Sequence, residues 1–294
     1  MSVALAYDAR QTFRRRQVRV PGGAGAIGES AADCLLKELE TWPKPGLVSH
    51  VDNGSHDDMD ADTFRRSAAA IKPYFQQLAD AASRGGSMGQ LRAIGIDAEA
   101  AMLSATSGIN THRGAIFGLG LLCAAAGAKA GGLVDPRLSL GAVVSRLWSR
   151  GIVEGPVLLH SHGSAARRRF RAGGARAEAA NGFPTVYQVG LPALWRAAQA
   201  VPNDREAARI EACFALISAV EDTNLLHRGG LDGLRFARRA TRLFLDQGGV
   251  RRSGWRERAR SVHQDFIARR LSPGGSADLL AMTLFIDMHE RPGP

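Results

Sequence analysis

Residues 64–82 read FRRSAAAIKPYFQQLADAA, and this stretch decides the fold class. Its apolar side chains recur at spacings of three and four, which is the period of one face of an α-helix. The same spacing runs through nine further segments, in which the strong helix formers alanine and leucine dominate. These are residues 31–39, 94–105, 115–126, 140–148, 193–200, 206–220, 231–245, 256–271 and 277–289.

Extended structure has little support in the sequence, where only residues 17–20 and 185–189 are candidate strands. We therefore predict an all-α protein with one large, bundle-like helical domain over residues 26–294, preceded by a flexible, arginine-rich arm over residues 1–25. The active site is expected at interhelical loops. Residues 23–28 match the glycine spacing of a dinucleotide-binding loop. Because no strand-helix-strand unit surrounds them, we interpret them as the end of the arm and a helix start.

Composition narrows the class of protein. Cys34, Cys123 and Cys213 are few, odd in number and far apart, which favours reduced core residues of a cytoplasmic protein. We find no secretory signal and no 18-residue apolar run, so we expect no membrane association. The net charge of +10 attracts phosphates. The arginine runs at residues 14–16 and 167–169 lack interleaved aromatic residues, so we expect small phosphorylated ligands rather than nucleic acid.

An acidic loop precedes the helical stretch of residues 64–82. Residues 52–60 read DNGSHDDMD, with four carboxylates and an imidazole in nine positions. Such a cluster is either solvated, serves as a helix cap, or holds a cation. Its oxygen-rich composition suits Mg²⁺ better than Zn²⁺.

Four more junctions of glycine and polar residues separate the predicted helices. Residues 107–114 precede a helix whose N-terminus, with Arg113, would suit an anion. The alternative there is a helix cap at Asn110 or Thr111. Residues 173–184 contain one acid, Glu178, and are expected to form a mobile loop. Residues 220–230 and 271–278 complete the set.

These junctions resemble a known family when taken in order. The matching motifs are residues 44–48 (KPGLV), 53–56 with 58–60, 108–117 (GINTHRGAIF), Glu178 before residues 182–184 (GFP), 222–226 with 228–230, and 272–281 (SPGGSADLLA). Asp57 lies at a position that the family motif leaves variable. Together they are similar to triphosphoribosyl-dephospho-CoA synthases. The resemblance implies that ATP transfers its 5-triphosphoribosyl group to the ribose 2′-hydroxyl of 3′-dephospho-CoA and that adenine leaves. The product would be the prosthetic-group precursor of an acyl-carrier subunit.

The resemblance also implies roles for individual residues. Mg²⁺ on the triphosphate is assigned to Asp58, Asp60 and Asp222. The candidate catalytic carboxylates are Glu178, Glu221 and Asp222, and either glutamate would suit as the base. Contacts to ATP and dephospho-CoA are expected from the remaining polar residues of the motifs, which are Lys44, Ser55, His56, Asn110, Thr111, His112, Arg113, Asn224, Arg228 and Asp278.

Several functional alternatives stay open at this point. A separate chain with an arginine-rich arm looks more like the malonate decarboxylase branch, whose product would pass to a holo-acyl-carrier-protein synthase, than the citrate lyase branch. A Mg²⁺-dependent hydrolase of ADP-ribose type would cut the same kind of bond with water. The non-enzyme alternative is a basic nucleic-acid-binding protein. A homodimer is compatible with the sequence.

Overall fold

The computed structural model describes residues 23–156 and 174–291. Their regular structure is helical, and these residues contain no strand. The all-α prediction is therefore confirmed. The arginine runs at residues 14–16 and 167–169 and the candidate strand at residues 17–20 lie outside the described residues.

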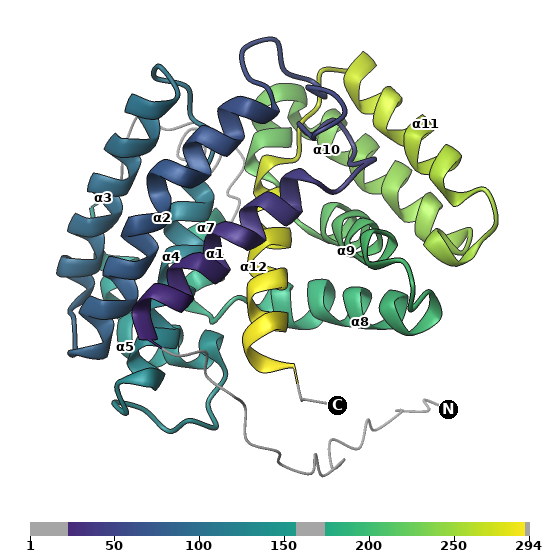
Figure 1. Ribbon diagram of the computed structural model, residues 1–294. Helices are drawn as coiled ribbons and strands as arrows, with labels where there is room; N and C mark the ends of the chain where they lie inside the picture. The colour runs from purple at the N-terminus through teal and green to yellow at the C-terminus, as the bar shows by residue number, and fades with distance from the viewer. Residues whose placement is uncertain (1–22, 157–173, 292–294) are drawn as a thin grey trace, which may run out of the picture.

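The first half of the chain forms a group of packed helices on one side of the molecule (Figure 1). Its helices are α1 (Gly23–Leu39), α2 (Ala61–Ser83), α3 (Met88–Ala105), α4 (Arg113–Ala130), α5 (Leu140–Glu154) and the short α7 (Gly174–Ala180). Helix α2 packs against α1, α3 and α4, while α5 packs against α4 and α7. The amphipathic stretch of residues 64–82 thus contacts three other helices of this group.

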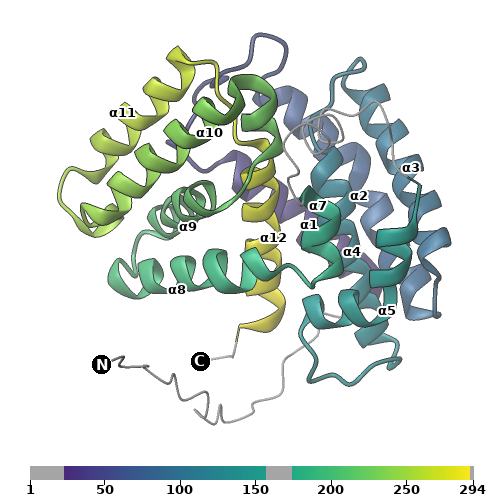
Figure 2. The same ribbon diagram turned by 180° about the vertical axis from the view of Figure 1, so that it is seen from behind.

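The other helices of the second half of the chain pack on the opposite side of the last helix from this first group (Figure 2). Its elements are a π-helical turn (Val186–Gly190), α8 (Leu191–Ala200), α9 (Arg205–Ala219), α10 (Thr223–Asp246), a 3₁₀ turn (Gly249–Arg251), α11 (Trp255–Ala268) and α12 (Gly274–Glu290). Helix α12 contacts α1 and α4 on one side and α9 on the other. It joins the two halves around one core.

Helix α4 is the most deeply buried element. It is the one helix in the described ranges long and apolar enough to cross a membrane by length and composition, and 72% of it is buried inside the protein. Burial of this extent is what a core helix requires. Glycine permits its close packing, since a Cβ at Gly127 would overlap the carbonyl oxygen of Ala79 in α2. The three cysteines are free and buried, as predicted.

The structure corrects three local predictions. Helix α1 begins at Gly23, before the expected domain boundary at residue 26. Residues 174–180, expected as part of a mobile loop, form α7, because four of these seven residues are alanine. Residues 185–189, one of two short candidate strands, enter the π-helical turn before α8. There the packing of buried Val186 and of Gly190 against Thr283 overrides the β-propensity of the segment.

Candidate active site

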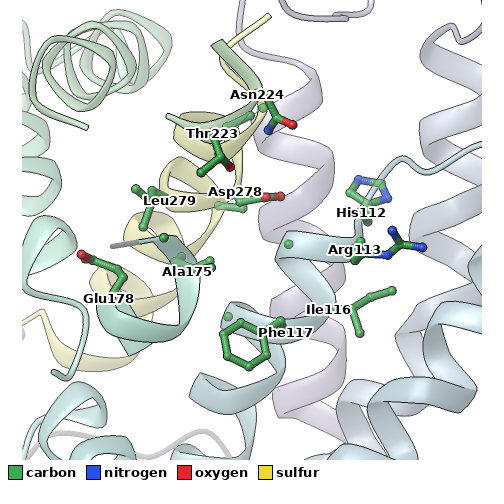
Figure 3. Close-up of a pocket in the computed structure, with 18 of the residues that line it drawn as sticks. His112, Arg113, Ile116, Phe117, Ala175, Glu178, Thr223, Asn224, Asp278 and Leu279 are labelled. Carbon is green, nitrogen blue, oxygen red and sulfur yellow. The ribbon is translucent and has the colours of Figure 1, made fainter. Parts of the chain in front are cut away.

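A cavity of about 1260 Å³ lies where the two halves of the chain meet. The N-terminal ends of α4, α10 and α12, helix α7, the inner faces of α2 and α3, and the loop before α2 line it. Figure 3 shows Arg113 and His112 on one wall, Thr223 and Asn224 on another, and Asp278 between them. Single-ligand pockets occupy roughly 300–1,000 Å³, so this cavity has room for two substrates of nucleotide size.

Asp222 holds two of these helix ends together. It is 1% exposed. One carboxylate oxygen accepts from the amide of Asn224 at 2.9 Å and caps α10. The other accepts from the amide and hydroxyl of Ser276 in α12, at 2.8 and 2.9 Å. Burial raises the pKa of Asp222 despite these bonds. Asp222 therefore fixes the geometry of the cavity wall.

Asp278 lies at the start of α4, where the sequence predicted a phosphate. Its carboxylate occupies the space over Gly114, and a Cβ at position 114 would overlap Oδ2 of Asp278. The amide of Ala115 faces the same carboxylate. A carboxyl group of the protein therefore already fills the space in front of this helix N-terminus. The expected phosphate site on the backbone amides of α4 is thus corrected.

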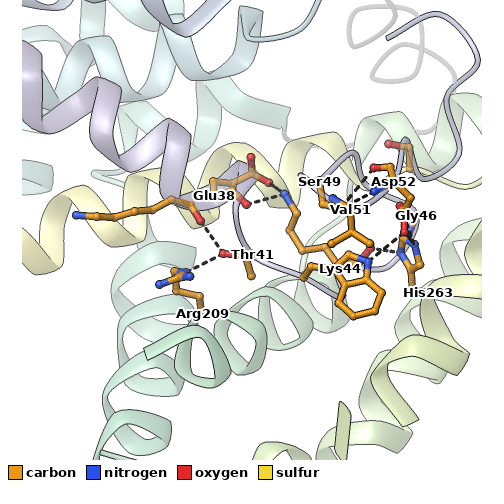
Figure 4. Close-up of polar contacts among 12 residues, drawn as sticks. Glu38, Thr41, Lys44, Gly46, Ser49, Val51, Asp52, Arg209 and His263 are labelled. Carbon is orange, nitrogen blue, oxygen red and sulfur yellow. Dashed lines mark hydrogen bonds and ion pairs between the residues drawn. The ribbon is translucent and has the colours of Figure 1, made fainter. Parts of the chain in front are cut away.

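Lys44 does not line the cavity, which corrects its expected contact with substrate phosphates. The side chain is 0% exposed. Its ammonium group forms an ion pair with the carboxylate of Glu38 and donates to the Glu38 carbonyl oxygen at 2.7 Å (Figure 4). Glu38, which does line the cavity, was not predicted as a site residue. Lys44 therefore affects the cavity indirectly, by holding the carboxylate of Glu38.

The turn that contains Lys44 is anchored to α11. His263 is 0% exposed and contacts both carboxylate oxygens of Asp52 at 3.1 Å. The other ring nitrogen of His263 meets the backbone of Lys44 and Gly46 (Figure 4). The indole of Trp42 donates to Asp52 at 3.0 Å. These bonds hold the turn around Lys44 in place against α11.

His112 and Arg113 differ in what they offer a phosphate. Burial lowers the pKa of His112 to about 3, so the ring is neutral and offers no positive charge to a phosphate. The Ser67 hydroxyl lies 2.6 Å from His112 Nδ1 and receives a bond from Thr111 at 2.7 Å. Arg113 is half-buried, forms an ion pair with Glu99, and leaves its Nε without a partner. Asn110 accepts from the Arg113 amide at 3.2 Å, as a cap would.

A second group of polar side chains, formed by Arg228, His56 and Ser272, also lines the cavity. Arg228 donates to the carbonyl oxygens of Ser55 and Arg270 at 3.1 and 3.2 Å and contacts His56 Nδ1 at 3.2 Å. His56 Nε2 lies 2.9 Å from the hydroxyl of Ser272. Burial and the charge of Arg228 lower the pKa of His56. His56 and Arg228 line the cavity and remain candidate binding residues.

Ser55 has a structural role instead. Its hydroxyl donates to the Leu271 carbonyl oxygen at 2.7 Å, and the residue is not part of the cavity lining. This corrects its assignment to substrate.

Glu178 and Glu221 both line the cavity but differ in setting. Glu178 accepts from the amide and hydroxyl of Thr185 at 2.7 and 2.9 Å. In Figure 3 its side chain points away from Asp278. Burial raises the pKa of Glu178. Glu221 is exposed. The Thr185 bonds give Glu178 a positioning role, because they close the turn after α7.

The predicted trio of Mg²⁺ ligands is not assembled. Asp58 is exposed at the cavity. Asp60 caps α2 through the amide of Thr63 at 2.8 Å and faces a smaller depression. Asp222 is already bonded by Ser276 and α10. Across residues 23–156 and 174–291, no group of three His, Cys, Asp or Glu side chains could hold a metal ion. A metal site formed by the protein alone therefore does not fit these residues.

The match to known proteins comes from sequence. Residues 24–293 fit the model of a family described as ATP:dephospho-CoA triphosphoribosyl transferase. The chain belongs to this family. It is accordingly an enzyme and a transferase.

Curated relatives match over almost the same length. The chain is 40% identical over 268 residues to the probable 2-(5''-triphosphoribosyl)-3'-dephosphocoenzyme-A synthase of Pseudomonas aeruginosa (strain UCBPP-PA14), covering 89% of each protein. It is 39% identical over 276 residues to the protein of the same name from Azotobacter vinelandii, covering 92% of this chain and 93% of the relative. No solved structure matches.

Proposed function

We propose that this enzyme transfers the 5-triphosphoribosyl group of ATP to the 2′-hydroxyl of 3′-dephospho-CoA and releases adenine. Family membership supports the reaction, and the size of the cavity is the structural observation that favours it over hydrolysis. A hydrolase needs space for one nucleotide and water, whereas about 1260 Å³ suits two bulky substrates. Holding both in contact supplies much of the rate enhancement of a two-substrate reaction.

Arginine side chains, rather than helix ends, are the proposed partners of the phosphates. The amides that begin α4, α10 and α12 face the carboxyl groups of Asp278 and Asp222, so these amides are not open to a phosphate. The arginines of the cavity lining are Arg92, Arg113, Arg176 and Arg228. A guanidinium group binds phosphate oxygens through two parallel bonds. Thr111 and Asn224 remain proposed polar contacts to the nucleotides.

Mg²⁺ is proposed to arrive on the triphosphate of ATP. Magnesium commonly keeps several waters and takes one or two carboxylates besides the phosphates. Asp58 and Glu221 are exposed carboxylates of the cavity that suit this limited contact. The protein's contribution is to orient the nucleotide and its ion.

The malonate decarboxylase branch is our proposal for the pathway, on the ground of the arginine-rich sequence of residues 1–25. The product would then pass to a holo-acyl-carrier-protein synthase in the cytoplasm. The citrate lyase branch is the alternative. Supplying purified product to each transfer enzyme with its own carrier protein distinguishes the branches, since our proposal requires preferential loading of the malonate decarboxylase carrier.

The experiment that tests the reaction is chromatography for free adenine. The enzyme is incubated with Mg²⁺ and ATP, with and without 3′-dephospho-CoA. Adenine should appear only when dephospho-CoA is present. Equal release without dephospho-CoA would indicate a hydrolase, and no release would reject the proposed activity.

A further inference from the structure

Asp278 has a position that its assignment to substrate binding does not explain. It lies in the first turns of α12, and Figure 3 shows its carboxyl group pointing from α12 toward the start of α4, inside the cavity. The absence of a side chain at Gly114 leaves the space that its Oδ2 occupies. The site therefore places this carboxyl group in a fixed orientation.

The groups around Asp278 favour its protonated form. Glu38 of α1 and Asp222 at the start of α10 are the charged neighbours that act on it most, and both repel a carboxylate. The ammonium group of Lys44 is paired with Glu38. At the start of α4, His112 is neutral and Arg113 is paired with Glu99. Burial, followed by repulsion from Glu38 and Asp222, raises the pKa of Asp278 well above its usual value, although the Ala115 amide lowers it.

The two glutamates of the cavity are less suited to donate a proton to a leaving base. Glu178 is oriented toward Thr185 by two hydrogen bonds. Glu221 is exposed to solvent. The pKa of Glu178 is also raised, but among these three carboxyl groups only that of Asp278 both points toward the start of α4 inside the cavity and has acidic neighbours, Glu38 and Asp222, that repel its ionised form.

We propose that Asp278 is the general acid that protonates adenine as it leaves the anomeric carbon of ATP. This inference rests on the proposed function. The bond from C1′ of the ATP ribose to N9 breaks, its electron pair stays with the base, and the Asp278 proton passes to an adenine ring nitrogen. The acceptor 2′-hydroxyl forms the new bond to C1′ and gives its proton to water. Asp278 regains a proton from solvent before the next turnover.

The decisive experiment measures the single-turnover rate of adenine release against pH for the wild type, Asp278→Asn and Asp278→Glu. A general acid is active when protonated, so the wild-type rate should fall as pH rises through the pKa of Asp278. Asp278→Asn should lower the maximal rate by about 10²–10⁴-fold and lose this basic limb. Asp278→Glu should restore part of the rate with the limb at a changed pH.

Binding and folding controls separate the proton-transfer role from others. The Kd for ATP should change less than about threefold in Asp278→Asn, because a general acid acts mainly in the transition state. Gly114→Ala should also slow adenine release, since its methyl group displaces Oδ2 of Asp278. Gly25→Ala in α1, which meets open space, is the matched control and should retain the wild-type rate.

Other results overturn the inference. An unchanged rate in Asp278→Asn, a basic limb that persists in that variant, or a loss explained by weaker ATP binding each contradicts the general-acid role. Activity that instead fell toward low pH through Asp278 would assign a base. Failure of the proposed function is distinguishable, because the wild type itself would then release no adenine that depends on dephospho-CoA.

Discussion

At the residue scale, the polar side chains of the five junctions divide into those that build the cavity and those that face into it. Asp222, Asp60 and Ser55 form the caps and cross-links described above. Lys44 lies outside the cavity lining and stabilises Glu38, which is part of that lining. The sequence identified the junctions correctly but could not separate these roles, because a carboxylate that caps a helix and one that binds a ligand occupy the same kind of segment. Glu38 escaped prediction because it lies inside an ordinary helical pattern.

The buried ion pair yields the first prediction. Lys44→Met removes the partner of the buried Glu38 carboxylate, and we expect the free energy of unfolding to fall by about 3–5 kcal/mol. The double variant Lys44→Met with Glu38→Gln should recover much of this loss, because no unpaired charge remains. Urea denaturation measures both. Equal instability of the single and double variants would show that the ion pair is not the cause.

His289 provides a pH-dependent prediction. Burial lowers its pKa to about 4 from an ordinary 6.5, and its Nε2 is buried without a partner. Between these pH values the unfolded chain binds more protons at His289 than the folded protein, so acid favours unfolding. From pH 7 to 5 the wild type should lose about 2 kcal/mol more than His289→Phe does. Parallel pH dependence of the two proteins in denaturation experiments would contradict the assignment.

At the element scale, periodicity predicted the long helices well, since the ten predicted segments fall within or largely overlap the observed helices. The errors lie where side-chain packing decides. Helix α7 was missed because glycines flank its alanines, and residues 185–189 were considered a candidate strand because they have high β-propensity. The N-terminal start of a helix was predicted later in the chain than observed wherever a polar or glycine-rich first turn precedes the apolar face, as in α1 and α10.

Gly127 tests the packing of α4 on α2. Gly127→Ala inserts a methyl group against the backbone oxygen of Ala79, and we expect the free energy of unfolding to fall by about 1–3 kcal/mol. Gly25→Ala is the control because its position is open, and it should leave stability equal or raise it slightly. Thermal unfolding distinguishes the two variants. A Gly127→Ala protein as stable as the control would contradict the close helix packing.

Asp60 tests whether the acidic loop holds Mg²⁺. As the cap of α2, Asp60→Ala should cost about 1 kcal/mol of stability, and Asp60→Ser should cost less. Neither variant should change the Mg²⁺ concentration that gives half-maximal adenine release. A tenfold or greater rise in that concentration would restore Asp60 as a metal ligand.

At the scale of the whole molecule, the site exists only because α12 joins the two halves of the chain. The cavity lining draws on segments from Leu35 to Met282, so no single motif contains it. The sequence predicted that several junctions would meet and which family the chain resembles. It could not predict that Asp278 would lie against Gly114, because that contact depends on the packing of α12 beside α4.

The central claim is the transfer of an intact triphosphoribosyl group, and mass spectrometry of the coenzyme product tests it most directly. The enzyme is supplied with ATP, Mg²⁺ and 3′-dephospho-CoA, and the coenzyme is recovered. We predict that it gains the whole triphosphoribosyl mass while free adenine accumulates in equal amount. A coenzyme that gained a single phosphate or an adenylate group, or that remained unmodified, would contradict the account.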